Sequence, residues 1–123
     1  MLDHIGINVS DFRRSRDFYA KALAPIGLEL LREPRAHTAG FGRDGKPFFF
    51  ISSERKPTTE HVHVAFPVDD RATVDAFHAA ALEAGGIDNG APGIRDIYHP
   101  NYYGAYVLDP DGNNIEAVCH RPG

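Results

Sequence analysis

The chain repeats its own pattern after 59 residues, and this repeat limits the folds open to it. DHIGINVSDFRRSRDFYAKALAPIG aligns without a gap over VHVAFPVDDRATVDAFHAAALEAGG. Identical residues coincide along the alignment, among them His4 with His63, Asp11 with Asp70 and Phe18 with Phe77. Self-similarity at a fixed spacing indicates that one structural unit is built twice. The sequence therefore predicts two modules of the same fold.

Each half begins with a pattern of alternating residues and continues with a helical one. Ile5, Ile7 and Val9 alternate with small or polar residues, as do the valines and Phe66 of VHVAFPV. Alternation predicts a strand with one face packed and the other exposed to something different. A helix then follows in each half, capped by Ser10 or Asp11 in the first and by Asp69 or Asp70 in the second.

Short strand patterns separated by turn signals follow each helix. In the first half they cover Leu28–Arg32, His37–Phe41 and Phe48–Ser52, and in the second Ile94–Tyr98, Tyr103–Leu108 and Asn114–Cys119. Asp44-Gly45 and Asp111-Gly112 are turn signals. These elements predict an α+β fold of two βαβββ modules in one domain: module one at 1–53, a polar linker at 54–60 and module two at 61–123. Because about 60 residues bury little core alone, the modules should pack together and enclose a shared cavity.

Composition excludes several classes of protein. The formal net charge is −4, so no basic surface for nucleic acid or a membrane is expected. The single cysteine, Cys119, rules out an internal disulfide and a cysteine-rich zinc site. The N-terminus has no apolar signal-peptide region and no stretch approaches transmembrane length, so a cytoplasmic protein is expected.

Three side chains are candidates for a metal site. His4 and His63 are equivalent in the repeat and lie on the strand faces turned away from the helices. In the last strand, Glu116 faces the same way between apolar neighbours, where a carboxylate is costly to bury without a positive partner. Two imidazoles and one carboxylate leave coordination positions open for water or substrate. Other histidines have ordinary structural explanations: His61 as a rim residue, and His37, His78 and His120 as hydrogen-bonded core or surface residues.

Three stretches, HIGINVSDFRRSRDFYAKAL, HVAFPV and DPDGNNIEAV, together resemble the vicinal oxygen chelate superfamily. This superfamily contains glyoxalase I, bleomycin- and fosfomycin-resistance proteins and extradiol dioxygenases. The resemblance implies two βαβββ modules that form a U-shaped mixed sheet around a divalent metal ion, either Fe, Mn, Zn or Ni. Carried over residue by residue, it implies His4, His63 and Glu116 as the ligands.

A fourth ligand position of the family lies at the end of module one, in GKPFFFISS. Pairing the two turns places either Phe49 or Phe50 there, and neither binds a metal. Glyoxalase I enzymes typically have a carboxylate at this point. The remaining set of two histidines and one carboxylate suits non-haem Fe(II) or Mn(II).

The stretch IYHPNYYGAYVLDPDGNNIE is similar to the extradiol dioxygenase signature. The resemblance implies His99 as an acid/base and Tyr106 as a hydrogen-bond donor to substrate. Ala105 departs from that signature, where a larger aliphatic residue is usual. Purely structural roles remain as alternatives. His99 would then be a loop residue before Pro100, and the packing of a strand would explain Tyr102, Tyr103 and Tyr106.

The sequence thus predicts a small metal-dependent enzyme, dioxygenase-like or lyase-like, acting on a small oxygenated substrate. A glyoxalase I-like lyase or isomerase and a non-catalytic ligand-sequestering resistance protein are the alternatives. The family resemblance further implies a homodimer.

Overall fold

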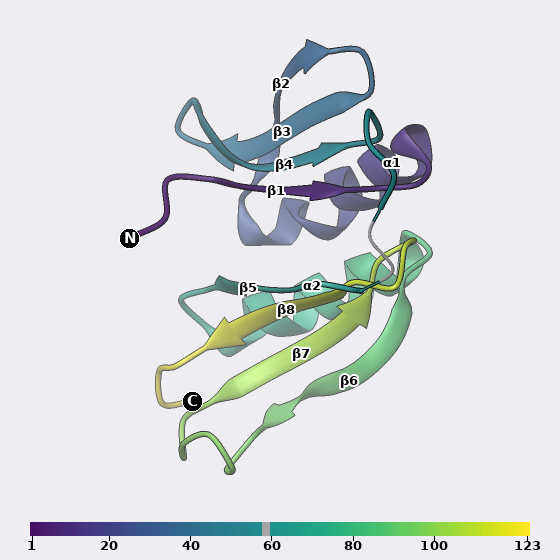
Figure 1. Cartoon of the computed structure of the whole chain (residues 1–123). Helices are drawn as coiled ribbons and strands as arrows, with labels where there is room; N and C mark the ends of the chain where they lie inside the picture. Colours follow the sequence, from purple (N-terminus) through teal and green to yellow (C-terminus); the bar gives the residue numbers. More distant parts are fainter. Residues whose placement is uncertain (58–59) are drawn as a thin grey trace.

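Two four-stranded sheets stand edge to edge, with a helix behind each, in the computed structural model of the chain (Figure 1). The structure describes residues 1–57 and 60–123, so positions 58 and 59 of the expected linker lie outside the described residues. The first module contains β1 (Ile5–Asn8), α1 (Phe12–Ala22), the 3-10 helix η1 (Ala24–Ile26), β2 (Glu29–Arg35), β3 (Thr38–Arg43) and β4 (Lys46–Ser52). The second contains β5 (His63–Pro67), α2 (Arg71–Glu83), β6 (Ile87–Ile94), β7 (Tyr103–Leu108) and β8 (Asn114–Cys119).

The predicted repeat is confirmed in the topology of the sheets. Their strand orders are β1-β4-β3-β2 and β5-β8-β7-β6, so each position in one sheet has a counterpart in the other. In each sheet the first strand pairs in parallel with the last, and the remaining pairs are antiparallel. The α+β class and the two βαβββ modules are therefore as expected.

Local sequence explains where the helices begin. The Asp11 carboxylate accepts a hydrogen bond from the Arg14 backbone N–H at 3.1 Å, and Asp70 accepts one from Thr73 at 2.7 Å. These are side-chain N-caps, and they select Asp11 and Asp70 from the two candidates in each half. None of the described helices has the length and apolar character needed to cross a membrane.

One expected strand is wrong. The structure has no strand over Ile94–Tyr98; β6 lies earlier, at Ile87–Ile94, and turns follow it. The segment IDNGAPGI contains two glycines and a proline, which are poor strand formers, so its sequence does not signal a strand. The sheet nevertheless accommodates it, because β6 is one of the two edge strands and its pairing register with β7 is twice interrupted.

The two modules share one hydrophobic core behind the sheets. Phe49 of β4 meets Phe66 of β5 edge to face, with ring centroids 5.4 Å apart, and both rings are buried. The Tyr19 hydroxyl on α1 donates to buried Asp109 after β7 at 2.5 Å, and the Ser10 N–H donates to Asp111 at 3.1 Å. These bonds tie module one to the turn that precedes β8, and so fix the position of Glu116 relative to β1.

Candidate metal site

Glu116 is the most buried ionisable side chain of the candidate site. It lies on β8 opposite Ala65 of β5 and Tyr106 of β7, and only 1% of its surface is exposed. One carboxylate oxygen is 2.8 Å from His63 Nε2, and the other accepts a hydrogen bond from the Tyr102 hydroxyl. Both oxygens therefore have partners, as a buried carboxylate requires. The structure brings two of the three sequence-predicted ligands into direct contact.

His4 lies immediately before β1 and lines a cavity of about 270 Å³ together with His63. Its Nδ1 contacts the Asp3 carboxylate at 2.7 Å, which leaves Nε2 available to a ligand. Lys46 donates to the same carboxylate at 2.6 Å and, as the main cause, lowers the pKa of Asp3. A carboxylate that holds the second nitrogen of a histidine is a common support for a metal ligand.

His4, the third expected ligand, does not complete a metal site with His63 and Glu116 in this conformation. Across residues 1–57 and 60–123, no three His, Cys, Asp or Glu side chains are grouped closely enough to hold a metal ion. His4 is instead turned toward Asp3, with 60% of its side chain exposed. The donor types fit a divalent ion, since one carboxylate and one imidazole are already in contact and a second imidazole borders the same cavity.

The register of the sheets settles which phenylalanine stands at the fourth position. Phe50 lies opposite Gly6 in the β1–β4 pair, as Glu116 lies opposite Ala65 in the β5–β8 pair. Phe49 is instead the counterpart of Ile115 and is fully buried behind the sheet. The described part of module one therefore offers an aromatic ring where module two offers a carboxylate.

Tyr102 is a site residue that sequence reasoning did not single out. Its hydroxyl bonds Glu116, whereas Tyr106 interacts with the Tyr102 hydroxyl and lies beside the His63 ring, 6.2 Å between centroids. Burial raises the pKa of both tyrosines, and the neighbouring carboxylate adds to the effect, so both remain protonated hydrogen-bond donors at neutral pH. Tyr103 points to the opposite face and donates to Asp75 of α2 at 2.6 Å. The alternation in NYYGAY could have separated the tyrosines in this way.

His99 lies in the turn before β7, at the edge of the tyrosine cluster. Its Nδ1 accepts from the Asn101 N–H at 3.1 Å, and its Nε2 is 2.9 Å from Nδ1 of His120. Because Nδ1 accepts, the neutral ring carries its proton on Nε2 and donates it to His120. Its ring centroid is 5.5 Å from that of Tyr102. In this conformation His99 reaches Glu116 only through Tyr102.

The remaining histidines lie away from Glu116. His61 lines a separate cavity of about 220 Å³ beside Asp111, and its ring packs near Gly112. His78 on α2 contacts Asp88 at 3.0 Å, and His37 packs against Phe12. These positions agree with the structural explanations given to them from the sequence.

Comparison with known proteins supports the fold on independent grounds. A crystal structure of a glyoxalase/bleomycin resistance protein from Albidiferax ferrireducens T118 shares 30% sequence identity over 97% of both chains, with a TM-score of 0.79. A glyoxalase/bleomycin resistance protein/dioxygenase family enzyme from Burkholderia phytofirmans PsJN has the same fold at 21% identity, covering 97% of this chain and 98% of that one, with a TM-score of 0.72.

A V278E mutant of glyoxalase I from Zea mays matches 95% of this chain at 25% identity and a TM-score of 0.67. The match covers only 45% of the maize chain. A search of curated protein sequences found no significant match. The family model of the Glyoxalase/Bleomycin resistance protein/Dioxygenase superfamily matches residues 1–117, and the chain belongs to this superfamily.

Proposed function

We propose that this protein is a divalent-metal-dependent enzyme that acts on a small oxygenated substrate, with dioxygenase-like or lyase-like chemistry. The single observation that supports it most is Glu116, a carboxylate with 1% of its surface exposed and an imidazole at 2.8 Å. A buried carboxylate is costly to keep for stability alone. In contact with His63, whose cavity is also bordered by His4, it is well suited to bind a cation.

His4, His63 and Glu116 would hold the ion, which would be Fe, Mn, Zn or Ni. His63 and Glu116 are already in contact, so an ion would take the place of their mutual hydrogen bond. His4 would present Nε2, while Asp3 keeps Nδ1 and so orients the ring. A bound metal would supply a Lewis acid for the oxygens of the substrate.

Phe50 favours dioxygenase-like or lyase-like chemistry over a glyoxalase I-like reaction. At the position of the fourth ligand its ring gives no donor atom, so the protein would contribute three ligands to the metal. A three-ligand set leaves more open positions for substrate than a four-ligand set does. A glyoxalase I-like activity is therefore the second candidate, supported by the similarity to the maize enzyme.

Tyr102 and Tyr106 would position the substrate, and His99 would serve proton transfer. Tyr102 holds one oxygen of Glu116, and Tyr106 stands between Tyr102 and the His63 ring. Both phenols are protonated at neutral pH. The Tyr102 proton is donated to Glu116, so Tyr106 is the phenol that would donate a hydrogen bond to a substrate oxygen. For acid/base work the ring of His99 would have to leave His120 and turn toward the cavity, since both its nitrogens are engaged.

A homodimer is the assembly we propose. Four large apolar side chains on β6 and in the following turn are exposed: Ile87, Ile94, Ile97 and Tyr98. The maize glyoxalase I chain is about twice as long as this one, so two copies here would match its length. In a symmetric, isologous dimer, the same apolar surface of each chain would be covered by the other chain. Sedimentation at micromolar concentration should give twice the 13.5 kDa of a single chain.

Metal stoichiometry tests the proposed function. Elemental analysis of purified protein should give about one divalent ion per chain, and Glu116→Gln should reduce it at least tenfold, because the amide is neutral and has one acceptor oxygen. His61→Ala is the matched control and should keep wild-type metal content, since its ring lines another cavity. If the wild type holds no metal after reconstitution with each of the four ions, the non-catalytic ligand-sequestering alternative takes its place.

A further inference from the structure

We propose that the open face of module one is a binding site for a small organic acid with a flat apolar body. The acid would be the substrate, and in that respect the inference rests on the proposed function. It assigns recognition of the acid to module one, whereas two of the three proposed metal ligands, His63 and Glu116, belong to module two.

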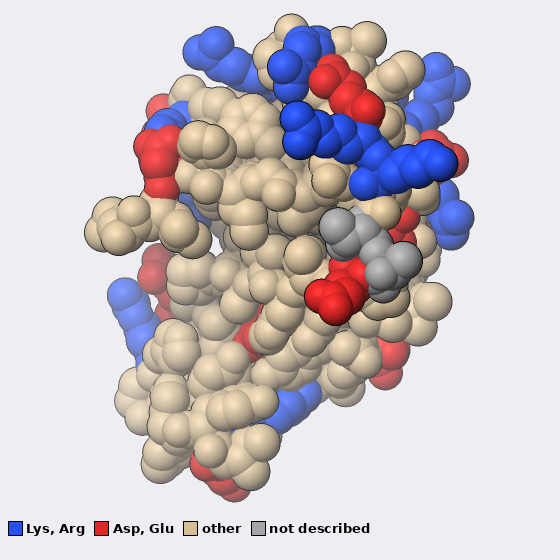
Figure 2. All heavy atoms as spheres, in the orientation of Figure 1, with Lys and Arg blue, Asp and Glu red and all other residues tan. Residues whose placement is uncertain are grey.

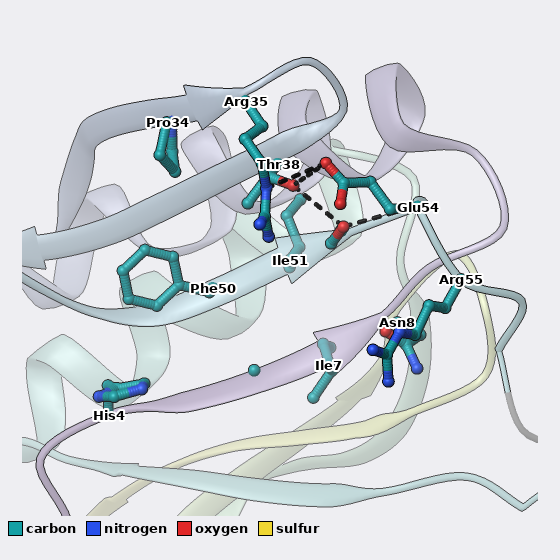
Figure 3. A pocket seen from close by; sticks show the side chains of 12 residues that line it. His4, Ile7, Asn8, Pro34, Arg35, Thr38, Phe50, Ile51, Glu54 and Arg55 are labelled. Carbon is teal, nitrogen blue, oxygen red and sulfur yellow. Dashed lines mark hydrogen bonds and ion pairs between the residues drawn. The ribbon is translucent and has the colours of Figure 1, made fainter.

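A cavity of about 660 Å³ lies over β1 and β4, on the side away from α1. Figure 3 shows its lining side chains, with His4 and Phe50 toward one side and Asn8 and Arg55 toward the other. The residues that matter here are His4, Asn8, Arg35, Thr38, Phe50 and Arg55. This volume is in the range of small-molecule sites. His4 also borders the smaller cavity of His63, so a molecule in the larger cavity lies next to the proposed metal ligands.

Phe50 provides the apolar part of this cavity. Its ring lies next to Gly40 of β3, where an added Cβ would come within 2.6 Å of the ring. Any larger residue at position 40 would displace the ring, so the glycine makes room for Phe50. The His4 ring stands edge-on to it, with centroids 5.8 Å apart. A planar group fits such a surface by offset or edge-to-face stacking.

Two arginines provide the charged part. Arg35 of β2 and Arg55, just after β4, both line the cavity (Figure 3). Arg35 Nε is 3.1 Å from Glu54 Oε1, and Thr38 donates weakly to the same oxygen at 3.4 Å. Guanidinium groups bind carboxylates through paired hydrogen bonds. A ligand carboxylate would therefore bind Arg55 and compete with Glu54 for Arg35.

The charged residues are also distributed unevenly between the two modules, with the positive excess in module one. Residues 1–57 contain ten Lys and Arg against seven Asp and Glu, a formal charge of +3, whereas residues 60–123 contain three against ten, a formal charge of −7. In Figure 2 the Lys and Arg side chains gather in the upper half of the molecule, over module one. An anion is therefore attracted toward the face of module one rather than that of module two.

The repeat provides an internal comparison. At equivalent register positions module one has Phe50 where module two has Glu116, and Gly40 where module two has Tyr106. The two faces are built on the same backbone plan. The face of module two carries a buried carboxylate, tyrosine hydroxyls and one guanidinium, that of Arg95 over the Tyr106 ring, whereas the face of module one carries a phenylalanine ring and two guanidinium groups. The difference is the one expected if an acid binds in module one and a cation in module two.

The test uses the full-length protein stripped of metal on a chelating resin, with 2-naphthoate and its neutral analogue 2-naphthamide as probes in calorimetric titrations. Naphthoate should bind about tenfold more tightly than the amide. Arg55→Gln and Arg35→Gln should each weaken naphthoate about five- to tenfold, a modest effect because both guanidiniums are partly solvated. Glu54→Gln should tighten it about two- to fivefold by releasing Arg35.

Lys56→Gln is the matched control, since Lys56 carries the same charge on the next residue and does not line the cavity. It should change the affinity less than twofold, and Phe50→Leu should weaken both probes about fivefold. Equal affinity for the two probes, or equal losses in the Lys56 and Arg55 variants, would overturn the proposal. Because the titrations use metal-free protein, a failure to bind naphthoate would not argue against the proposed metal site. Equally, a failure to bind metal would not change the result of the naphthoate titrations.

Discussion

Phe50 and Glu116 occupy equivalent positions in the two modules: Phe50 lies opposite Gly6, and Glu116 lies opposite Ala65. Gly6 and Ala65 each lie two residues after the histidine that the repeat matches, His4 or His63. One side chain is an aromatic ring half-exposed to a cavity, and the other is a carboxylate with 1% of its surface exposed. The backbones of the two modules therefore match at this position while their side chains differ, so the two faces are suited to different ligands.

Glutamate at position 50 should restore a fourth ligand. Phe50→Glu places a carboxylate at the counterpart of Glu116, so we expect tighter metal binding and a changed order of preference among Fe, Mn, Zn and Ni. Competition titrations of the stripped protein measure both. Phe49→Glu is the control: Phe49 is fully buried, so this variant should fold poorly and gain no ligand. Unchanged affinity and preference in a folded Phe50→Glu protein would contradict the assigned position.

Removing the Tyr102 hydroxyl should destabilise the metal-free protein. Tyr102→Phe leaves one oxygen of buried Glu116 without its donor, which typically costs about 1–3 kcal/mol of the free energy of unfolding. Tyr103→Phe removes a hydroxyl from the opposite face of the same segment, where its hydrogen bond to Asp75 is exposed, and should cost about 0.5 kcal/mol or less. Urea unfolding of both variants measures the difference. Equal losses in the free energy of unfolding would show that the Tyr102–Glu116 hydrogen bond stabilises the protein no more than the Tyr103–Asp75 bond does.

Tyr19 should make the protein sensitive to alkali. Burial, reinforced by Asp109, holds the pKa of Tyr19 well above its usual value near 10. Since the folded-state pKa is raised, the stabilising effect is complete below pH 10 and declines as the pH rises beyond it, because only the unfolded chain then loses the proton. The slope is about 1.4 kcal/mol per pH unit for this one group.

Tyr19→Phe should therefore reduce the dependence of the unfolding free energy on pH above 10 by about that slope. The variant should also be less stable at neutral pH, since the hydroxyl donates to buried Asp109. Urea unfolding at several pH values between 8 and 11 measures both effects. If wild type and variant lose stability in parallel through this range, the alkaline sensitivity comes from other tyrosines.

His99→Ala should lower turnover while leaving metal content near that of the wild type, once an activity has been found. A positioned acid/base contributes about 10²–10⁴-fold. His120→Ala is the comparison. His120 Nδ1 contacts Nε2 of His99 and its ring packs against Tyr102, but it is not a proposed acid/base, so the variant should have the smaller effect. Full activity in His99→Ala, or loss of metal instead of turnover, would return His99 to a structural role in its turn.

Periodicity and the internal repeat were sufficient to predict the order of the elements. Tyr103–Leu108 and Asn114–Cys119 have the predicted bounds, and Asp11 and Asp70 cap the helices as two of the four candidates. The edge strand β6 was missed because its pairing with β7, and not the propensity of its residues, holds it extended.

The site was predictable only in part, for reasons of register and side-chain direction. Sequence placed either Phe49 or Phe50 at the fourth position, since the two turns differ in length by one residue and only the β1–β4 pairing decides between them. Tyr102 precedes β7, so its contact with Glu116 depends on how the turn enters the strand. The interaction of His99 with His120 likewise depends on loop geometry that no local pattern specifies.

The measurement that tests the central proposal most directly is X-ray absorption spectroscopy of the zinc-loaded protein. The wild type should show two imidazole ligands and one carboxylate, at roughly 2.0–2.2 Å from the metal, with the remaining scattering from water. His4→Ala and His63→Ala should each show one imidazole, whereas His61→Ala should still show two. An unchanged imidazole count in His4→Ala together with a lower one in His61→Ala would contradict the ligand set of His4, His63 and Glu116.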